Sequence, residues 1–355
     1  MTANRPLAIW LLSVSTLIVV LIVYGGWVRL TRSGLSIVEW NVVTGVVPPL
    51  GTEAWESEFA KYRQTPEYQI VNYGMQLDEF KFIYYMEFGH RLLGRVAGLL
   101  FAVPLFYFLF RRTLPRAHIP SYLGIGLLFA LQGLVGWLMV KSGLSDRPQV
   151  SHLRLTLHLS CALALLAACL WRAFDYLSPP TAPDVPRTIR RLCVGLFAAV
   201  CLQIAAGGLV AGLKAGHVAD TFPKMFGAWI PAGLWALQPP LINLLDNAAT
   251  VHFQHRFFAF VVLGLVLALY AAARRAAPHL KTAVLWVLGL IAVQIGLGIG
   301  TIILHVPLSL ASLHQAVAVA LFAATLFLCH CAYMSKSPAA KKSSSPLAIL
   351  PSISK

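Results

Sequence analysis

The chain has 355 residues, of which 58% are hydrophobic and only 12% are charged, and its formal net charge is +15. Soluble proteins carry about twice that share of charged residues, so the composition excludes an ordinary soluble domain. Apolar segments of 18 or more residues recur along the chain, and each is long enough to cross a bilayer as a helix. A membrane strand would be shorter and would alternate in polarity, so we predict an all-α integral membrane protein.

The apolar segments predict eight membrane spans, at residues 7–28, 83–110, 120–140, 153–174, 189–213, 251–273, 281–303 and 309–334. Basic residues gather in one set of connections between these spans, and most acidic residues lie in the alternate set. This positive-inside pattern places both termini in the cytoplasm and argues against a nucleic-acid partner. Because the first span is not followed by a cleavage pattern, the sequence favours the bacterial inner membrane over an imported organellar protein.

The two halves of the chain resemble each other weakly. VYGGWVRLTRSG matches AAGGLVAGLKAG, EFGHRLLGRVAGLL matches HFQHRFFAFVVLGL, and FALQGLVGWLM matches IAVQIGLGIGT. Chance similarity could explain one such pair of apolar segments, but three pairs in the same order favour a parallel duplication. We therefore predict two pseudo-repeated four-helix units, at 1–175 and 188–334, and a disordered cytoplasmic tail at 335–355.

The outer loop at residues 30–80 is long and rich in aromatic residues. Its amphipathic pattern predicts that it lies on the membrane surface and covers a site. The six cysteines fall within or at the edges of predicted spans, so a structural disulfide is not expected. The absence of C-x-x-C-H from the sequence excludes covalent haem attachment through that motif.

Seven of the eleven histidines gather at the outer ends of the even-numbered spans. In an up-down four-helix bundle the diagonal helices are parallel, so spans two and four face each other, as do spans six and eight. Each bundle can therefore present two histidines from opposite sides at similar depth, which is the geometry of a bis-histidine haem.

The residue one turn after each histidine helps to choose among them. A porphyrin ligated by a helical histidine lies flat against that helix, so the residue one turn away on the same face should be small. Gly94 follows His90, with Gly98 a turn later, while alanines follow His158, His255 and His314 by four residues. The competitors His152, His252 and His305 are followed at that spacing by Thr156, Arg256 and Ser309. We predict His90, His158, His255 and His314 as iron ligands, although small residues are common in membrane helices for packing alone. Zinc is disfavoured because the cysteines are badly placed to join the imidazoles.

The charged residues beside these histidines differ between the halves. Arg91, Arg95 and Arg256 are candidate partners for haem propionates, or they reach to the membrane interface. Three residues before its first ligand, the first half has Glu87 and the second has His252. Because electron transfer needs no buried carboxylate, we predict catalysis by Glu87 in the first half and an electron relay in the second. The alternative role for Glu87 is a structural partner for Arg91.

In these features the chain resembles the haem A synthase family, of the type shared by proteobacteria and mitochondria. The resemblance rests on GGWVRLTRSGLSIVEWNVVTGVVPPL, TPEY, FKFIYYMEFGHRLLGR, the His158 region, FQHR and SLHQA, and it spans nearly the whole chain. A cysteine pair that another branch carries in the first outer loop is absent here, so a thiol role proposed for that pair cannot apply.

The resemblance implies oxidation of the C8 methyl group of haem o to a formyl group, giving haem a for terminal oxidases. It implies that His90 and His158 hold haem o as substrate, that His255 and His314 hold a haem b cofactor, and that Glu87 takes part in catalysis. It also implies a homo-oligomer in the lipid bilayer, with haem O synthase and terminal oxidase assembly factors as candidate partners. Two alternatives remain open: a dihaem b-type electron-transfer cytochrome, and a haem-free transporter with a histidine proton relay.

Overall fold

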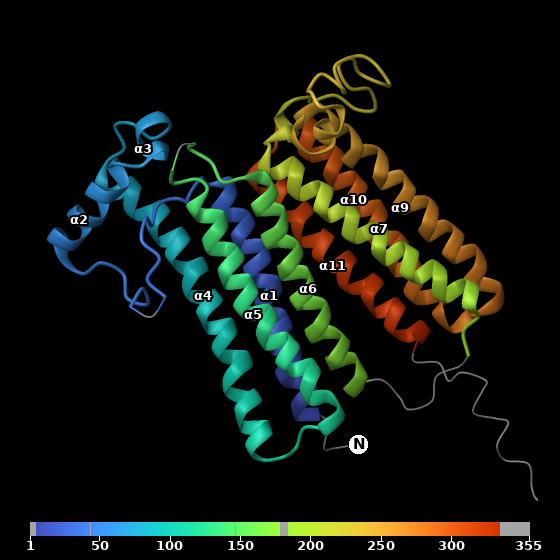
Figure 1. Cartoon of the computed structure of the whole chain (residues 1–355). Coiled ribbons are helices and arrows are strands. Elements are labelled where there is room, and N and C mark those ends of the chain that lie inside the picture. The colour runs from blue at the N-terminus through green and yellow to red at the C-terminus, as the bar shows by residue number, and fades with distance from the viewer. Residues whose placement is uncertain (1–4, 43, 146, 178–183, 334–355) are drawn as a thin grey trace, which may run out of the picture.

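A computed structural model describes residues 5–42, 44–145, 147–177 and 184–333 (Figure 1). Within these residues eight helices are long and apolar enough to cross a membrane, and no strand is present. The prediction of an all-α membrane protein is confirmed. The predicted tail at 335–355 lies outside the described residues, as does the proline-rich stretch 178–183.

Each predicted span corresponds to one long helix. These helices are α1 (Arg5–Leu30), α4 (Leu77–Phe110), α5 (Ile119–Lys141), α6 (His152–Leu177), α7 (Arg187–Gly212), α9 (Ala248–Ala276), α10 (Lys281–Ile303) and α11 (Leu308–Tyr333). The largest difference is at α4, which begins at Leu77 rather than at 83. The Glu79 carboxylate accepts a hydrogen bond of 2.8 Å from the Gln76 backbone N–H, and this capping contact extends the helix beyond its apolar segment.

The long helices pack as two groups of four. In one group α1, α4, α5 and α6 pack in a ring that places α4 opposite α6, and in the other α7, α9, α10 and α11 place α9 opposite α11 (Figure 1). The two groups, named here the first and second bundles, meet along α1, α6, α7 and α11. The loops that carry the 31–76 and 213–247 segments lie at the same end of the molecule, named here the loop end (Figure 1).

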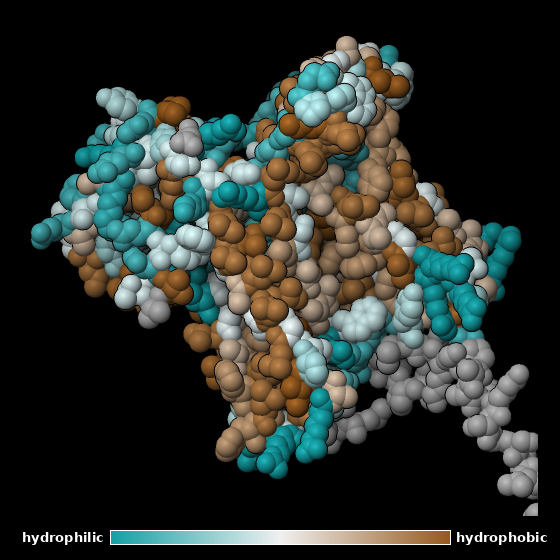
Figure 2. Space-filling view, in the orientation of Figure 1, coloured by the Kyte–Doolittle hydropathy of each residue, from teal (hydrophilic) through white to brown (hydrophobic). Residues whose placement is uncertain are grey.

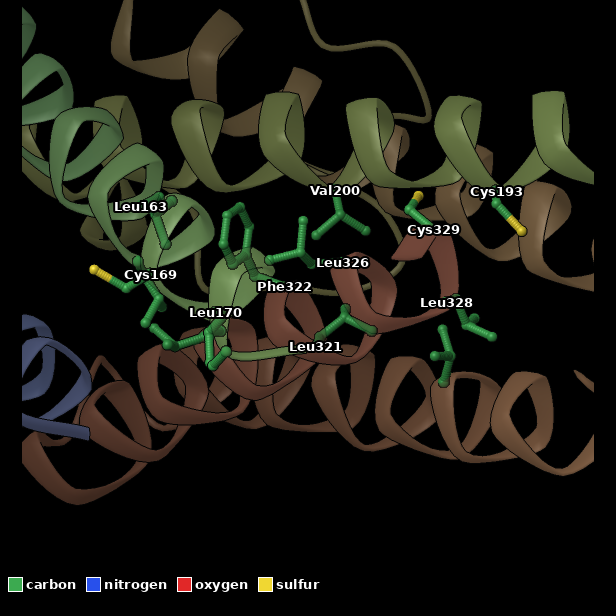
Figure 3. Close-up of a cluster of buried hydrophobic side chains, with 14 of the residues drawn as sticks. Leu163, Cys169, Leu170, Cys193, Val200, Leu321, Phe322, Leu326, Leu328 and Cys329 are labelled. Atoms are coloured by element: carbon green, nitrogen blue, oxygen red, sulfur yellow. The ribbon is translucent and has the colours of Figure 1, made fainter. Parts of the chain in front are cut away.

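A continuous apolar core joins the two bundles. Figure 3 shows part of it, where Phe322 and Leu326 of α11 lie among side chains of α6 and α7, including Leu163 and Val200. Lipid tails are as apolar as these residues, so close packing rather than exclusion from water holds the bundles together. All six cysteines are free, and three of them are buried in or near this core.

The loop at residues 31–76 keeps here the name first outer loop from its predicted side, as the loop at 213–247 keeps the name second outer loop. The first outer loop folds into two short helices, α2 (Gly51–Arg63) and α3 (Pro66–Ile70), of which α2 packs near the start of α4. An aromatic cluster joins α2 to α4. The rings of Phe59 and Tyr62 in α2 stack on the ring of Phe80 in α4, and their centroids lie 4.9 and 5.2 Å from the Phe80 centroid. Figure 2 shows this loop region as largely hydrophilic, in contrast to the apolar sides of the long helices. The loop is therefore an ordered unit fixed to α4 by its apolar face.

The second outer loop contains the short helix α8 (Asn243–Asp246) before α9. The side chain of Asn247 accepts hydrogen bonds from the backbone N–H groups of Ala249 and Thr250, at 3.0 and 3.3 Å. These bonds satisfy two of the first N–H groups of α9 and fix where that helix begins. His252 and His255 are therefore the fifth and eighth residues of this helix.

Candidate functional site

One large cavity opens within both bundles near the loop end. It has a volume of about 1030 Å³, and its lining includes residues from all eight long helices. All four predicted ligands, His90, His158, His255 and His314, line it. The volume is at the upper end of the range of cavities that bind small molecules and cofactors. The structure therefore brings the four predicted histidines to one internal space.

Each of these histidines packs against a glycine of the preceding span. A methyl group added to that glycine would meet the imidazole ring. The four pairs, with the distance from the added carbon to the nearest ring atom, are Gly25–His90 (2.9 Å), Gly136–His158 (2.9 Å), Gly207–His255 (3.1 Å) and Gly298–His314 (3.1 Å). The glycines allow the rings to lie directly on the neighbouring backbone, which fixes the ring positions by shape.

In the second bundle the two histidine rings lie close together. The centroids of the His255 and His314 rings are 6.3 Å apart and their planes are inclined by 78°. Imidazoles on opposite sides of one metal ion, with metal–nitrogen bonds of about 2.0 Å, have centroids roughly 6 Å apart. The spacing of this pair therefore suits a metal ion held between the two rings.

Three of the four histidines also contact a glutamine that the sequence analysis missed. The glutamine amide nitrogen and the nearest ring nitrogen are separated by 3.4 Å in Gln132–His158, 3.2 Å in Gln203–His255 and 3.3 Å in Gln294–His314. Each glutamine lies four residues before the packing glycine, so both face the same histidine. The signal was visible as QGLVG, QIAAG and QIGLG in three odd-numbered spans.

Glu87 is buried at the edge of the cavity, with only 3% of its surface exposed. Its carboxylate accepts hydrogen bonds from the Ser36 hydroxyl at 2.8 Å and from the Ile37 backbone N–H at 2.9 Å. Arg91 forms an ion pair with it at 2.6 Å. Glu87 therefore fixes the start of the first outer loop to α4, one turn before His90. The structural role considered for Glu87 is present, and its predicted catalytic role stays a prediction.

The second bundle repeats this arrangement with a neutral group in place of the carboxylate. The guanidinium of Arg91 donates to the carbonyls of Ile37 and Glu39, at 2.9 and 2.8 Å. That of Arg256 donates to the carbonyls of Ala219 and Thr221, at 2.8 and 2.7 Å.

The carbonyl residues stand at equal spacing after Gly25 and Gly207, so the correspondence between the halves extends into the outer loops. Arg256 also donates to the Nε2 atom of His252 at 3.0 Å, where Arg91 contacts Glu87. Both arginines therefore hold the outer loop of their own half.

Of the remaining predicted site residues, some line the cavity and one does not. Arg95 lines the cavity and donates to the carbonyls of Val42 and Asn41, at 2.9 and 2.7 Å. Gly94 lines the cavity, whereas Gly98 is outside its lining, and an added methyl group at either would meet no described atom within 4 Å. The propionate role predicted for Arg91, Arg95 and Arg256 stays a prediction, and the hydrogen bonds of these arginines are with groups of the protein.

Of the three competing histidines, His252 also lines the cavity, where it accepts a hydrogen bond from Arg256, and the other two lie outside the lining near carboxylates. The Nε2 atom of His152 lies 2.7 Å from the carboxylate of Asp246, and the Nδ1 atom of His305 lies 3.9 Å from that of Asp220. No group of three or more His, Cys, Asp or Glu side chains that could hold a metal ion occurs among the described residues. The geometry thus offers pairs of imidazoles across a bundle rather than a compact polydentate metal site.

Charged groups lie at the loop end of the cavity. Glu67 of α3 is buried, and burial raises the pKa of its carboxyl group, while Arg32 and Lys214 act in the opposite direction. Burial lowers the pKa of Lys214. Glu67 and Glu87 are the only carboxylates among the described residues that line the cavity, and both belong to the first half of the chain.

Comparisons with known proteins give one consistent result. The family described as cytochrome oxidase assembly protein matches residues 8–326. A relative from Nitrosospira multiformis, named heme A synthase, is 46% identical over 333 residues, which cover 92% of this chain and 93% of the relative. Relatives with the same activity in their names are 43% identical in Nitrosomonas eutropha and 40% identical in Homo sapiens. They cover 92% of this chain each, and 93% and 82% of their own lengths.

Proposed function

The chain belongs to the family of cytochrome oxidase assembly proteins, and from this membership and the paired histidines we propose that it is a haem A synthase. The reaction proposed is oxidation of the C8 methyl group of haem o to a formyl group, giving haem a for terminal oxidases. The observation that carries the proposal is the single cavity in which two pairs of histidines meet, one pair from each bundle.

The residues present fit haem. His255 and His314 have the ring spacing of two axial ligands, and Gly94, Ala162, Ala259 and Ala318, each four residues after a predicted ligand, line the cavity beside them. Small residues at these places leave room for a flat ring against each helix. In this proposal His90 and His158 hold haem o, the substrate, and His255 and His314 hold haem b, the cofactor.

Haem b, when bound, supplies electron transfer, while the oxidation takes place at haem o. The residues of the chain bind and orient these groups. The four packing glycines and three glutamines fix the imidazole rings, and the apolar lining accommodates the hydrophobic tail of haem o. The outer loop, held by Arg91 and Arg95, closes the loop end of the first bundle and limits entry of water.

Glu87 is proposed as the group that accepts or relays protons during the oxidation. Its carboxylate lies on the cavity lining, one turn from His90, and the corresponding position of the second bundle holds His252. Its donors Ser36, Ile37 and Arg91 hold the carboxylate in one position. A fixed base near the reacting group is what a proton-removing step needs.

The setting proposed is the bacterial inner membrane, with both termini in the cytoplasm and the loop end outside. The two bundles are proposed to be duplicated units, 1–175 and 188–334, which the repeated glycine–histidine and arginine–carbonyl contacts support. Candidate partners are haem O synthase, terminal oxidase assembly factors and a second copy of this chain.

The test uses a bacterial host that makes haem o and no haem a. The purified full-length protein is expected to be coloured, and its extracted haems, identified by mass, should include haem b and haem a. Extraction of haem b alone, with haem o present in the membranes, would indicate an electron-transfer cytochrome instead. A colourless protein would contradict both readings and indicate a transporter.

A further inference from the structure

Each predicted haem ligand packs against the preceding span at a place named here a histidine corner, and three of the four corners share one pattern of packing residues. His158, His255 and His314 each face a glycine that a glutamine precedes by four residues, as Gln132, Gln203 and Gln294 do. His90 faces Gly25, and the residue four before it is Leu21, in the sequence LIVYG. Leu21 and the three glutamines all line the cavity, so the four positions are equivalent and only the side chain differs.

The glutamines are placed to restrain their histidines. Each glutamine leaves its Oε1 atom buried without a partner, while its amide nitrogen lies against Nε2 of His158, Nδ1 of His255 or Nε2 of His314. The Nδ1 atoms of His158 and His314, which do not contact the glutamine, are buried and unpaired. Rotation of the Gln132 or Gln294 amide by 180° exchanges its oxygen and nitrogen, so Oε1 can accept a hydrogen bond from the ring N–H, whereas the Gln203 amide also donates to the His255 carbonyl at 2.9 Å. A metal-binding histidine is oriented, and its ligand strength is raised, by such a bond from its other ring nitrogen.

His90 lacks this restraint because a leucine side chain accepts no hydrogen bond. Its ring is instead stacked near Tyr24, with centroids 6.1 Å apart and planes inclined by 29°.

We propose that Leu21 makes His90 the most weakly held of the four haem ligands, so that a small external ligand displaces His90 at the first site. The iron–nitrogen bond to His90 breaks and a bond from iron to the incoming molecule forms, with no change of oxidation state. Glu87 lies on the same helix face as His90, three residues earlier, and both line the cavity. This inference rests on the proposed function, because it requires haem between His90 and His158.

The test exchanges the pattern between the two bundles. Leu21→Gln gives His90 the missing amide, and Leu21→Met is its matched control, with similar length and no amide group. Gln294→Leu gives His314 the pattern of the first site. Each purified full-length protein is first checked for two haems by extraction, and carbon monoxide is then titrated into the reduced protein and followed by difference spectroscopy. His158→Ala, which removes a ligand of the first site, identifies the first-site signal.

The wild-type protein and Leu21→Met are expected to bind carbon monoxide at the first site. Leu21→Gln should bind it about tenfold more weakly or worse, the usual size of such an outer hydrogen bond. Gln294→Leu should gain carbon monoxide binding at the second site. Equal affinities in Leu21→Gln and Leu21→Met, or no gain in Gln294→Leu, would overturn this inference alone. A wild-type protein that holds haem only between His255 and His314 would overturn the proposed function and this inference together.

Discussion

The first and second bundles have the same frame and differ in the groups that face the cavity. Both pack two histidines on two glycines, and in both an arginine next to a histidine holds two carbonyls of the outer loop. The first bundle adds Glu87 where the second has His252, and the carboxylate of Glu67 lies beside the cavity from the loop of the first half alone. The comparison teaches that the contacts shared by the two bundles build the scaffold proposed to bind haem, while the acids mark the half in which chemistry is expected.

Removal of one histidine from each bundle should separate the two sites most completely. His158→Ala should lose the haem of the first bundle, abolish haem a formation and leave the spectrum of the second-bundle haem. His255→Ala should lose the other haem, because its partner His314 cannot hold both sides of the iron alone. Quantitative haem extraction and optical spectra measure both outcomes. Loss of both haems from either variant would mean that the bundles do not bind haem independently.

Glu87→His converts the first bundle to the pattern of the second. We expect haem content to stay unchanged and haem a formation to fall by about 10²-fold or more, the usual contribution of a positioned acid or base. Glu87→Gln keeps an oxygen atom that can accept hydrogen bonds from Ser36 and Ile37 but carries no titratable group. Product yield per bound haem measures the effect. Full activity of Glu87→Gln would restrict Glu87 to its anchoring role.

Arg91→Leu and Arg256→Leu remove arginines at equivalent positions of the two bundles, and they should lower the free energy of unfolding by different amounts. Loss of Arg91 leaves Glu87 buried without its cation, which typically costs about 3–5 kcal/mol. Loss of Arg256 leaves the neutral His252 and two unpaired carbonyls, a penalty of about 1–3 kcal/mol. Thermal unfolding in detergent should therefore show a larger destabilisation for Arg91→Leu. Equal shifts for the two variants would contradict a charged Glu87–Arg91 pair.

The eight spans could be predicted because hydrophobic length is a direct requirement of the bilayer. The span predicted at 281–303 coincides with α10, and the one at 309–334 differs from α11 by one residue at each end. The choice of His90 and His158 over His152 also followed from a local rule, the small residue one turn away. The structure places all four chosen histidines on one cavity.

The contacts of the outer loops could not be predicted in this way. Arg91 and Arg95 read as partners for an external anion, because nothing local indicates that residues 37–42, about fifty positions earlier, bring carbonyls to them. The aromatic cluster that packs α2 against α4 likewise depends on contacts between residues far apart in the sequence. The glutamines, by contrast, had a visible signal, and only the comparison of all four corners reveals that Leu21 departs from it.

The smallest expected effect concerns Glu67, which belongs to the outer loop of the first half. Burial raises the pKa of this carboxyl group in the folded protein, with Arg32 and Lys214 opposing the shift. Because the folded pKa lies above the unfolded value, the stabilisation is fully present at low pH and is lost as the pH rises through the folded pKa.

We therefore expect α3 to exchange its amide hydrogens faster at pH 7.5 than at pH 4, below the ordinary pKa of a glutamate, after correction for intrinsic exchange, because an ionised Glu67 is less stable in its buried position. Glu67→Gln should remove this pH dependence, whereas the exposed Glu53 of α2 offers a matched control in Glu53→Gln, which should leave it intact. Hydrogen exchange followed by mass spectrometry on peptides covering residues 66–72 makes the measurement. The same pH dependence in Glu67→Gln as in the wild type would show that another group controls the docking of this loop. The carboxylate of Glu67 would then not contribute to the difference between the first half and the second.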